Sequence, residues 1–451
     1  MGMDEEKKNL YRRMGVVALP IILQNLLDAA VNSADVLMLN AVGQEAISAA
    51  SLAGSVVNLF FMFLYGIGTG IAMLAAQYYG KGDTDTIEKV EGIGLRYSLI
   101  MAGIGALAFL LCPRLLMLIY TSDETLIPLG VAYLRVMAPG IIFWAVSAVY
   151  TSVLRCTGRV GTATAIEAIS LISNVILNAV FIFGLLGLPK LGVMGVGIAT
   201  SLSRLIQLIS CMLVSRKAEV KLTFKTMCES HPLLHKDFKT MALPAIGNDV
   251  VWGLAFSMYT VIFGHLGSDA VAANSIVSTV RNLGCVFCYG IGSAAGIIVG
   301  QILGEGKRQE SIKTARTMLK MAIAAGIFGG LVVLGVTPFV MKHAALSEQA
   351  LDYLKFMLLI NTYYITGTAV NTALIAGIFR AGGDSRFGFI CDTIDMWVYA
   401  VPLGFLAAFV FKLPVKVVYF LLCTDEFVKW PWVFKHFYSN KWANDITRDN
   451  V

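Results

Sequence analysis

The amino-acid sequence predicts an all-α integral membrane protein with twelve transmembrane helices in two parallel six-helix repeats. Three observations lead to this fold class. Only 14% of the 451 residues are charged and 57% are hydrophobic, whereas soluble domains carry about 25% charged residues. Apolar runs long enough to cross a bilayer recur along the chain. The tetrapeptide Tyr65-Gly66-Ile67-Gly68 returns in the second half as Tyr289-Gly290-Ile291-Gly292, and a repeat over this distance indicates a duplicated bundle.

The repeat continues in the same register on both sides of this tetrapeptide. Leu19-Pro20 corresponds to Leu243-Pro244, Gly43 to Gly267, Gln77 to Gln301, and Gly80-x-Gly82 to Gly304-x-Gly306. Glycine and proline set helix packing, bends and turns. We therefore expect the two halves to share one scaffold.

Each half contains six apolar segments of about the 20 residues that a span needs. In the first half they are residues 15–37, 52–77, 92–119, 131–152, 163–185 and 193–214. In the second half they are residues 241–264, 275–301, 316–340, 353–376, 388–411 and 413–430. The last segment has a short apolar core, Leu413 to Cys423, with Asp425 and Glu426 directly after it.

The placement of Lys and Arg predicts the orientation. With the N-terminus in the cytoplasm, most of the 35 basic residues fall in inner loops and tails. Only Arg114, Lys190, Lys342, Lys412 and Lys416 fall outside. By the positive-inside rule, both termini are cytoplasmic in the plasma membrane. Six helices per repeat make the repeats parallel, which predicts an N-lobe (1–215), a cytoplasmic linker (216–240) and a C-lobe with a cytoplasmic tail (241–451).

Helix 15–37 carries a polar stripe at membrane depth. Asn25, Asp28, Asn32 and Asp35 follow one another at steps of three, four and three positions, so they share one helix face. Ionisable groups at this depth are costly and usually mark pathways or paired sites. The stripe is either a structural hydrogen-bond seam or a site for a cation or proton. We favour the cation or proton site because no Lys lies nearby in the span.

Helix 163–185 carries a matching stripe, Glu167, Ser170, Asn174 and Asn178. Hard cations take carboxylate, amide and hydroxyl oxygens as ligands. We therefore expect Asp35, Asn174 and Asn178 to meet, with Thr200 from the next helix.

The corresponding face in the second half is mostly aromatic. In the register of the repeat, the stripe of helix 15–37 becomes Asp249, Trp252, Phe256 and Tyr259. An aromatic stripe is usually packing, but aromatic faces beside a carboxylate also suit an organic cation. We assign these four residues to a substrate cavity.

Two further groups of charged residues lie within spans of the second half. Asp392 and Asp395 share a face of helix 388–411. We assign Asp395 to the substrate cavity. The structural alternative is that one of the two pairs with Arg380 or Arg386. Arg281 lies inside helix 275–301 and either neutralises an acidic partner or lines the cavity.

Several classes of chemistry leave no trace in the sequence. We find no Walker motif, nucleophile elbow, zinc spacing or kinase signature, so we expect neither an enzyme nor a resident cofactor. Most basic residues lie in short loops, and this pattern does not indicate nucleic-acid binding. Cys285 and Cys288 lie in an apolar run and are interpreted as small buried helix residues. Energy for any transport must come from an ion gradient, a partner or the substrate's own gradient.

The motifs resemble those of the multidrug and toxic compound extrusion (MATE) family of secondary transporters. No single motif is diagnostic, but their order and spacing cover nearly the whole chain. They are Leu19-Pro20, Asp35-x-x-Met38 with Gly43 beyond it, Gly66-x-Gly68, Gln77-x-x-Gly80-x-Gly82, Arg155-x-x-Gly158, Gly192-x-x-Gly195-x-Gly197-x-Ala199-Thr200, Arg380-x-x-Gly383-Asp384 and Ser439-x-Lys441-Trp442.

The resemblance implies a V-shaped, two-lobe transporter that exports compounds in antiport with Na⁺ or H⁺. Its N-lobe cation site matches Asp35, Asn174, Asn178 and Thr200, and a Na⁺ at Asp35 is the only metal expected. Many members carry Asp at the position of Asn178, so this set holds one carboxylate unless Asp28 contributes.

A second branch of the family uses a Glu of the seventh helix and an Asp of the tenth. This sequence has neither at the expected depth. Helix 353–376 offers Tyr364, Thr368 and Asn371 instead.

These observations together predict a monomeric exporter of small amphipathic, cationic organic compounds in contact with membrane lipid. A flippase for lipid-linked precursors, from the same superfamily, is the first alternative. The cavity of that class tends to be cationic, whereas this one is expected to be acidic. A membrane enzyme or a channel is the second alternative, and the five His residues offer no convincing catalytic pair.

Overall fold

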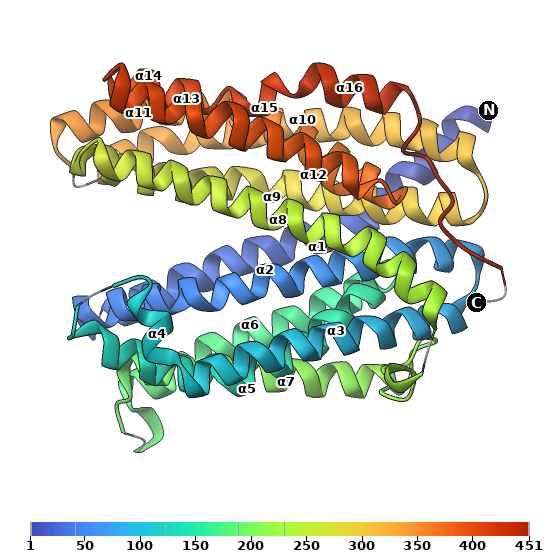
Figure 1. Ribbon diagram of the computed structural model, residues 1–451, viewed down its shortest axis with the longest axis horizontal. Coiled ribbons are helices and arrows are strands. Elements are labelled where there is room, and N and C mark those ends of the chain that lie inside the picture. The colour runs from blue at the N-terminus through green and yellow to red at the C-terminus, as the bar shows by residue number, and fades with distance from the viewer. Residues whose placement is uncertain are drawn as a thin grey trace. The chain divides into compact units, whose positions relative to one another are not determined.

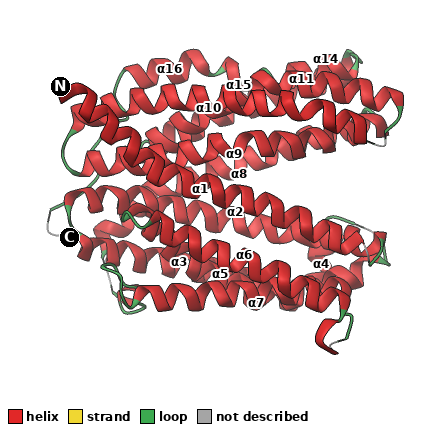
Figure 2. Cartoon of the chain, turned by 180° about the vertical axis from the view of Figure 1, so that it is seen from behind, coloured by secondary structure: helices red, strands yellow, loops and turns green. Residues whose placement is uncertain are grey.

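The computed structural model describes the backbone of residues 2–40, 42–121, 123–187, 189–229, 231–344 and 346–449. Throughout these residues the chain forms helices joined by loops, and no strand occurs among them (Figure 2). The predicted all-α class is therefore confirmed.

The helices follow one another as the hydropathy pattern predicts, although several begin earlier or end later. The first half contains α1 (Gly2–Asn40), α2 (Gln44–Lys81), α3 (Thr84–Leu111), α4 (Pro113–Leu118), α5 (Leu126–Cys156), α6 (Val160–Phe183), the 3₁₀ segment η1 (Leu185–Gly187), α7 (Gly192–Ser215) and the 3₁₀ segment η2 (Thr226–Cys228) (Figure 1). The second half begins with α8 (Pro232–His265), α9 (Ser268–Gly304), α10 (Arg308–His343) and α11 (Glu348–Asn371).

The last part of the chain has a more broken helical path. Helix α11 continues into the π-helical segment η3 (Thr372–Phe379), and α12 (Ser385–Thr393) continues through the π-helical η4 (Ile394–Ala400), α13 (Val401–Phe405) and the π-helical η5 (Leu406–Val410). The short helices α14 (Val415–Leu422), α15 (Asp425–Val428) and α16 (Trp430–Tyr438) then follow. Repeats of π-helical turns are rare and frequently occur at functional sites.

Ten helices of the described residues are long and apolar enough to cross a membrane. They correspond to ten of the predicted spans, so the chain is a multi-pass membrane protein. The other two predicted spans, 353–376 and 413–430, correspond to α11 with η3 and to α14–α16. The total of twelve spans stays a prediction.

The described chain packs into two compact units that exchange helix ends. Unit 1 comprises Met1–Ile22 and Leu243–Thr447, and unit 2 comprises Leu23–Ala242 with the residues from Arg448 on. Helices α1 and α8 therefore each contribute to both units, and the change occurs close to Pro20 and Pro244. The lobes 1–215 and 241–451 and the linker 216–240 stay predictions, and packing assigns Met1–Ile22 to the unit of the second half.

In unit 2, α5 packs against α7, α2 and α3, and α6 packs against α7 (Figure 1). Small residues allow this close approach, because a Cβ at Gly140 would meet Ser201 of α7. The chain end also belongs to this unit, since Arg448 forms an ion pair with Asp237 and Asp449 with Lys81.

In unit 1, α10 packs against α11 and α9, and α9 also packs against η3. Gly329 lies directly against the backbone of Gly284, and Gly330 lies against that of Thr362. The first helix end joins this unit, because Arg13 donates a 2.6 Å hydrogen bond to Gln301 and Gly290 faces Ile22.

The repeated glycines have a direct conformational reason. Gly43 and Gly267 precede α2 and α9 with φ of 135° and 111°, and Gly82 and Gly306 follow the same helices with φ of 79° and 75°. L-residues with a side chain rarely adopt positive φ. The internal repeat is therefore a repeat of turns as well as of helices.

Candidate functional site

Three of the predicted cation-site residues are joined by hydrogen bonds in unit 2. Asn178 of α6 donates to the Oδ1 of Asn174 at 3.1 Å, and the Nδ2 of Asn174 donates to the Oγ1 of Thr200 on α7 at 3.2 Å. Asn178 is fully buried, and Asn174 nearly so. The helical period places both amides on one face of α6, and the packing of α6 on α7 brings Thr200 to them.

The fourth member of this set lies on α1. The backbone of Asp35 is helical, but the side chains of Asn32 and Asp35 lie outside the described residues. The cation-coupling role of Asp35, Asn174, Asn178 and Thr200 stays a prediction.

Asp28 belongs to a charge cluster with arginines. It interacts electrostatically with Glu167, Arg204 and Arg155 and accepts a hydrogen bond from Gln24. Arg155 and Arg204 lie 3.7 and 3.9 Å from the carboxylate of Glu167. The interpretation as a cation or proton site considered only Lys as a basic neighbour, whereas Arg204 supplies a positive charge from within the span of α7.

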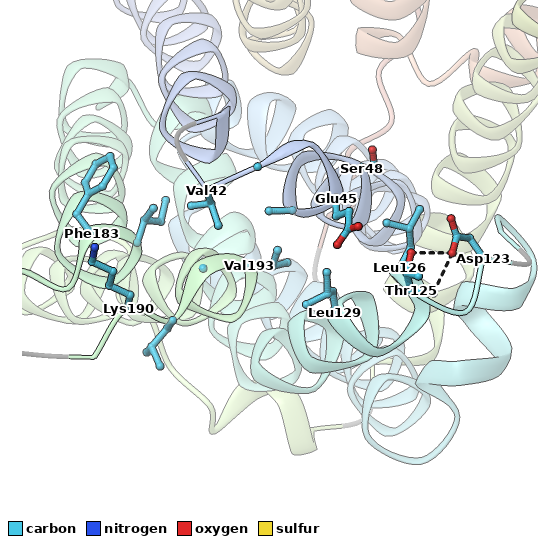
Figure 3. Close-up of a pocket in the computed structure, with 15 residues that line it drawn as sticks. Val42, Glu45, Ser48, Asp123, Thr125, Leu126, Leu129, Phe183, Lys190 and Val193 are labelled. Atoms are coloured by element: carbon cyan, nitrogen blue, oxygen red, sulfur yellow. Dashed lines mark hydrogen bonds between the residues drawn. The ribbon is translucent and has the colours of Figure 1, made fainter.

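A cavity of about 930 Å³ opens at the end of unit 2 that holds the α1–α2, α4–α5 and α6–α7 connections (Figure 3). Charged groups on its wall include Glu45, Asp123 and Lys190. Thr125 donates two hydrogen bonds to Asp123, and they hold the pKa of the Asp123 carboxyl below its usual range. Of the predicted site residues whose side chains the structure describes, none lines this cavity.

In unit 1, Asp249 of the aromatic stripe forms an ion pair. Its Oδ1 accepts a 2.7 Å hydrogen bond from Arg380, and the same guanidinium group donates to the Oδ1 of Asn248 at 2.8 Å. The amide of Asn248 donates in turn to Asp392 at 2.7 Å. A continuous polar network therefore connects α8, the segment after η3, and α12.

This network leads to a buried lysine that contacts three carboxylates. The Nζ of Lys429 lies 3.0 Å from Asp392, 3.3 Å from Asp395 and 3.4 Å from Glu426. These side chains are 3–8% exposed. The sequence analysis missed Lys429. The spacing of Asp425, Glu426 and Lys429, at three and four positions, was the available signal.

Two helices supply hydrogen-bond donors to the remaining carboxylates. Tyr259 and Tyr364 donate to the Oδ2 of Asp425 at 3.0 and 3.4 Å. Thr368 and Asn371 of α11 donate to Glu426 at 3.0 and 2.5 Å. The polar side chains that α11 offers in place of an acidic one therefore bind two carboxylates that lie after α14.

The sequence analysis named Arg380 or Arg386 as the possible ion-pair partner of Asp392 or Asp395, and this partner was wrong. Asp392 and Asp395 contact Lys429, whereas Arg380 pairs with Asp249. Asp425 and Glu426 had been read as residues that follow the apolar core of the last span. They are buried because their partners come from α8 and α11 and from Lys429.

The aromatic stripe forms a continuous series of ring contacts. Ring centroids are 4.4 Å apart between Trp252 and Phe256 and 5.3 Å apart between Phe256 and Tyr259. The guanidinium of Arg281 lies 5.1 Å from the centre of Phe256 and 6.0 Å from that of Tyr364. Tyr259 is buried in the core, while Trp252, Phe256 and Arg281 are partly exposed. A resident cation thus already occupies an aromatic face of the stripe.

A sequence profile of the MatE family matches this chain twice, over residues 20–180 and 244–406. The two matches start at Pro20 and Pro244, which are the prolines that the internal repeat aligns. This chain belongs to the MatE family. It is a membrane transporter by family and fold, and the resemblance drawn from its motifs is confirmed.

Named relatives of this MatE protein come from several bacteria. It is 25% identical over 429 residues to the "Probable multidrug resistance protein YoeA" of Bacillus subtilis, with 91% of this chain and 90% of that protein covered. It is 22% identical over 451 residues to the "Probable multidrug resistance protein NorM" of Thermotoga maritima, with 99% and 97% covered.

Solved MATE structures share the fold at low sequence identity. A mutant of the Vibrio cholerae MATE transporter VcmN superposes with a TM-score of 0.87 at 16% identity, over 97% of this chain and 99% of that one. A MATE structure in complex with MaL6 gives a TM-score of 0.86 at 19% identity, over 96% and 97%. The predicted two-lobe transporter fold is therefore confirmed.

Proposed function

We propose that this MatE protein exports small amphipathic, cationic organic compounds from the cytoplasm in exchange for Na⁺ or H⁺. It works as a monomer in the plasma membrane, with both termini cytoplasmic and lipid around its spans. Relatives named as multidrug resistance proteins over most of the chain support this substrate class.

The observation that carries the proposal is the excess of carboxylates inside unit 1. Among the described residues, Arg380 and Lys429 pair with four buried or partly buried carboxylates, which are Asp249, Asp392, Asp395 and Glu426. The buried Asp425 is a fifth, and it accepts hydrogen bonds from Tyr259 and Tyr364. An acidic interior beside an aromatic stripe favours an organic cation. The same interior disfavours the pyrophosphate group of a lipid-linked precursor, so the flippase alternative is not supported.

The cycle is an alternating-access exchange. Organic cations bind along Trp252 and Phe256, where they compete with Arg281 for the aromatic faces. The coupling ion binds in the first lobe at Asp35, with the amides of Asn174 and Asn178, Thr200 and Asp28 as its polar surroundings. An ion shifts such an equilibrium only by its different affinity for the two states, so the site must differ between inward- and outward-open forms.

The test is efflux of a cationic dye such as ethidium from proteoliposomes, with Na⁺ and pH gradients imposed separately. We expect Asp35→Asn to abolish gradient-driven efflux while the protein stays folded, and Asp85→Asn, a change at an exposed carboxylate, to leave efflux intact. Normal efflux from the Asp35→Asn protein would overturn the assignment. Ion current without saturation would instead indicate a channel.

A further inference from the structure

The carboxylates around Lys429 are buried and outnumber their cations among the described residues. Among the described residues, Lys429 is the one basic side chain that pairs with Asp392, Asp395 or Glu426, and Asp425 lies next to Glu426 in the chain. All four carboxyl residues are 0–6% exposed. Burying several uncompensated negative charges together is strongly unfavourable, so the cluster must take up positive charge.

Three of the four carboxylates have hydrogen bonds that favour their ionised form. Asp392 accepts from Lys429 and from the amide of Asn248. Asp425 accepts from two tyrosines and from the backbone N–H of Glu426. Glu426 accepts from Thr368 and Asn371. Donors directed at a carboxylate stabilise its charge.

Asp395 differs from the other three. It is 5% exposed, its Oδ1 has no hydrogen-bond partner among the described residues, and its Oδ2 is left with Lys429, at 3.3 Å. An ionised carboxylate so poorly solvated is costly, whereas a protonated one is neutral. Asp395 also lies in η4, a π-helical segment that departs from regular helix geometry at this point.

We infer that Asp395 is a proton-binding site in unit 1, with Lys429 as the cation that responds to its protonation state. When Asp395 holds a proton, Lys429 pairs with Asp392 and Glu426. When the O–H bond breaks and the proton leaves to water, the new carboxylate competes for the same ammonium group. If the proposed antiport holds, H⁺ serves as a coupling ion in this unit. That functional consequence is the one part of the inference that rests on the proposed function.

The titratable groups that face Asp395 come from α8, α12, α15 and the residue after α15. They are Asp392 and Cys391 of α12, Tyr259 of α8, Asp425 and Glu426 of α15, and Lys429 after α15. Of these, only Lys429 carries a positive charge. Binding or loss of a proton at Asp395 therefore alters the pairing of Lys429. The change extends along the hydrogen bonds of Asp392 and Asn248 to Arg380.

The direct test is infrared difference spectroscopy of the purified full-length protein between mildly acidic and mildly alkaline buffer. A protonated carboxyl group has a C=O stretching band that its ionised form lacks. We expect such a band in the wild type, its loss in Asp395→Asn, a shifted band in Asp395→Glu, and no change in Asp352→Asn. Asp352 is the matched control because it is exposed and pairs with Lys416. An unchanged band in Asp395→Asn would overturn the inference.

The stability of the variants gives a second test that needs no transport. An amide mimics a protonated carboxyl group, so we expect Asp395→Asn to fold with near-native thermal stability. Asp392→Asn removes an ionised partner of Lys429 and should lower it clearly. Equal destabilisation by the two changes would contradict the assignment of the proton to Asp395.

The transport arm separates this inference from the proposed function. In proteoliposomes we expect Asp395→Asn to lose ethidium efflux driven by a pH gradient, while the exposed control Asp352→Asn keeps it. If the wild type moves no dye under either gradient, the proposed function fails while the infrared result still stands. If efflux by Asp395→Asn keeps the wild-type pH dependence, the coupling role fails and the antiport stands.

Discussion

The phenol of Tyr259 donates a 3.0 Å hydrogen bond to the carboxylate of Asp425. Tyr259 occupies the position in the second repeat that Asp35 occupies in the first. The repeat has therefore exchanged a carboxylate on the first helix of one half for a hydrogen-bond donor in the other. The carboxylates of the second half are supplied mainly by α12, η4 and α15.

The first prediction concerns this hydrogen bond. Tyr259→Phe removes one of the three donors to a fully buried carboxylate. We expect a loss of about 1–3 kcal/mol in the free energy of unfolding, because the remaining partner stays desolvated. Thermal or denaturant unfolding in detergent measures it. Tyr438→Phe, at a residue that is 58% exposed, is the control and should unfold like the wild type.

The second prediction concerns Lys429. Lys429→Met leaves three contacting carboxylates without their cation, and breaking a buried ion pair in this way costs roughly 3–5 kcal/mol. We expect the loss to be smaller in acidic buffer, because carboxylates that bind protons no longer repel one another. Lys416→Met removes a partly exposed pair with Asp352 and should cost little at any pH. A pH-independent loss for Lys429→Met would argue against this charge balance.

The third prediction concerns the cation that already lies on the aromatic stripe. The guanidinium of Arg281 is 5.1 Å from the centre of Phe256, and such contacts contribute about 0.5–2 kcal/mol. Removing it in Arg281→Gln should tighten the binding of cationic dyes, seen as a lower KM for efflux and a lower Kd in detergent. Arg281→Lys keeps the charge and should behave more like the wild type. Weaker dye binding by Arg281→Gln would show that Arg281 does not compete with the substrate.

The fourth prediction concerns the amide chain of unit 2. Asn178→Asp places a carboxylate beside Asn174 and Thr200, and hard cations bind more tightly as carboxylate ligands are added. We expect dye efflux by this variant to become more dependent on a Na⁺ gradient. Asn178→Leu removes the oxygen ligand and should reduce coupling to either gradient. Identical Na⁺ dependence in the wild type and Asn178→Asp would exclude Asn178 from the cation site.

The fifth prediction concerns the chain end. The ammonium group of Lys81, 2.6 Å from Asp449, holds the pKa of the Asp449 carboxyl below its usual range. Folding lowers this pKa, so the contact contributes its full stability above the unfolded-state pKa of about 3.9. That stability is lost as the pH falls through the folded-state pKa. We expect the tail to detach only in strongly acidic solution, as measured by hydrogen exchange of its amides. In Lys81→Met, exchange of the Asp449 amide should be faster already at neutral pH, while Arg448, still paired with Asp237, keeps the preceding residues in place.

The fold could be predicted because its determinants are local. Apolar length, the positive-inside pattern and repeated glycines each act within one helix or turn. Gly43 and Gly267, for example, are required by the same positive φ before α2 and α9. The same local logic placed Asn174 and Asn178 on one face, and helix packing added Thr200.

The charge network of unit 1 could not be predicted in the same way. Asp425 and Glu426 follow a short apolar stretch, and on sequence they resemble residues at a membrane surface. They are buried because Tyr259, Tyr364, Thr368 and Asn371 reach them from far along the chain. The π-helical turns that position Asp395 also have no sequence signature as simple as an apolar period.

The exchange of helix ends between the two units has a consequence for biosynthesis. The segment Met1–Ile22 leaves the ribosome first, yet the groups it contacts, Gln301 and Gly290, are made much later. Unit 2 likewise lacks its contacts to Phe238 and Ala242 on α8 until synthesis has passed the middle of the chain. The core of unit 1 therefore cannot be completed before most spans have been made, whereas the core of unit 2 needs only the start of α8. A gene cut between α7 and α8 would separate each half from part of its own interior.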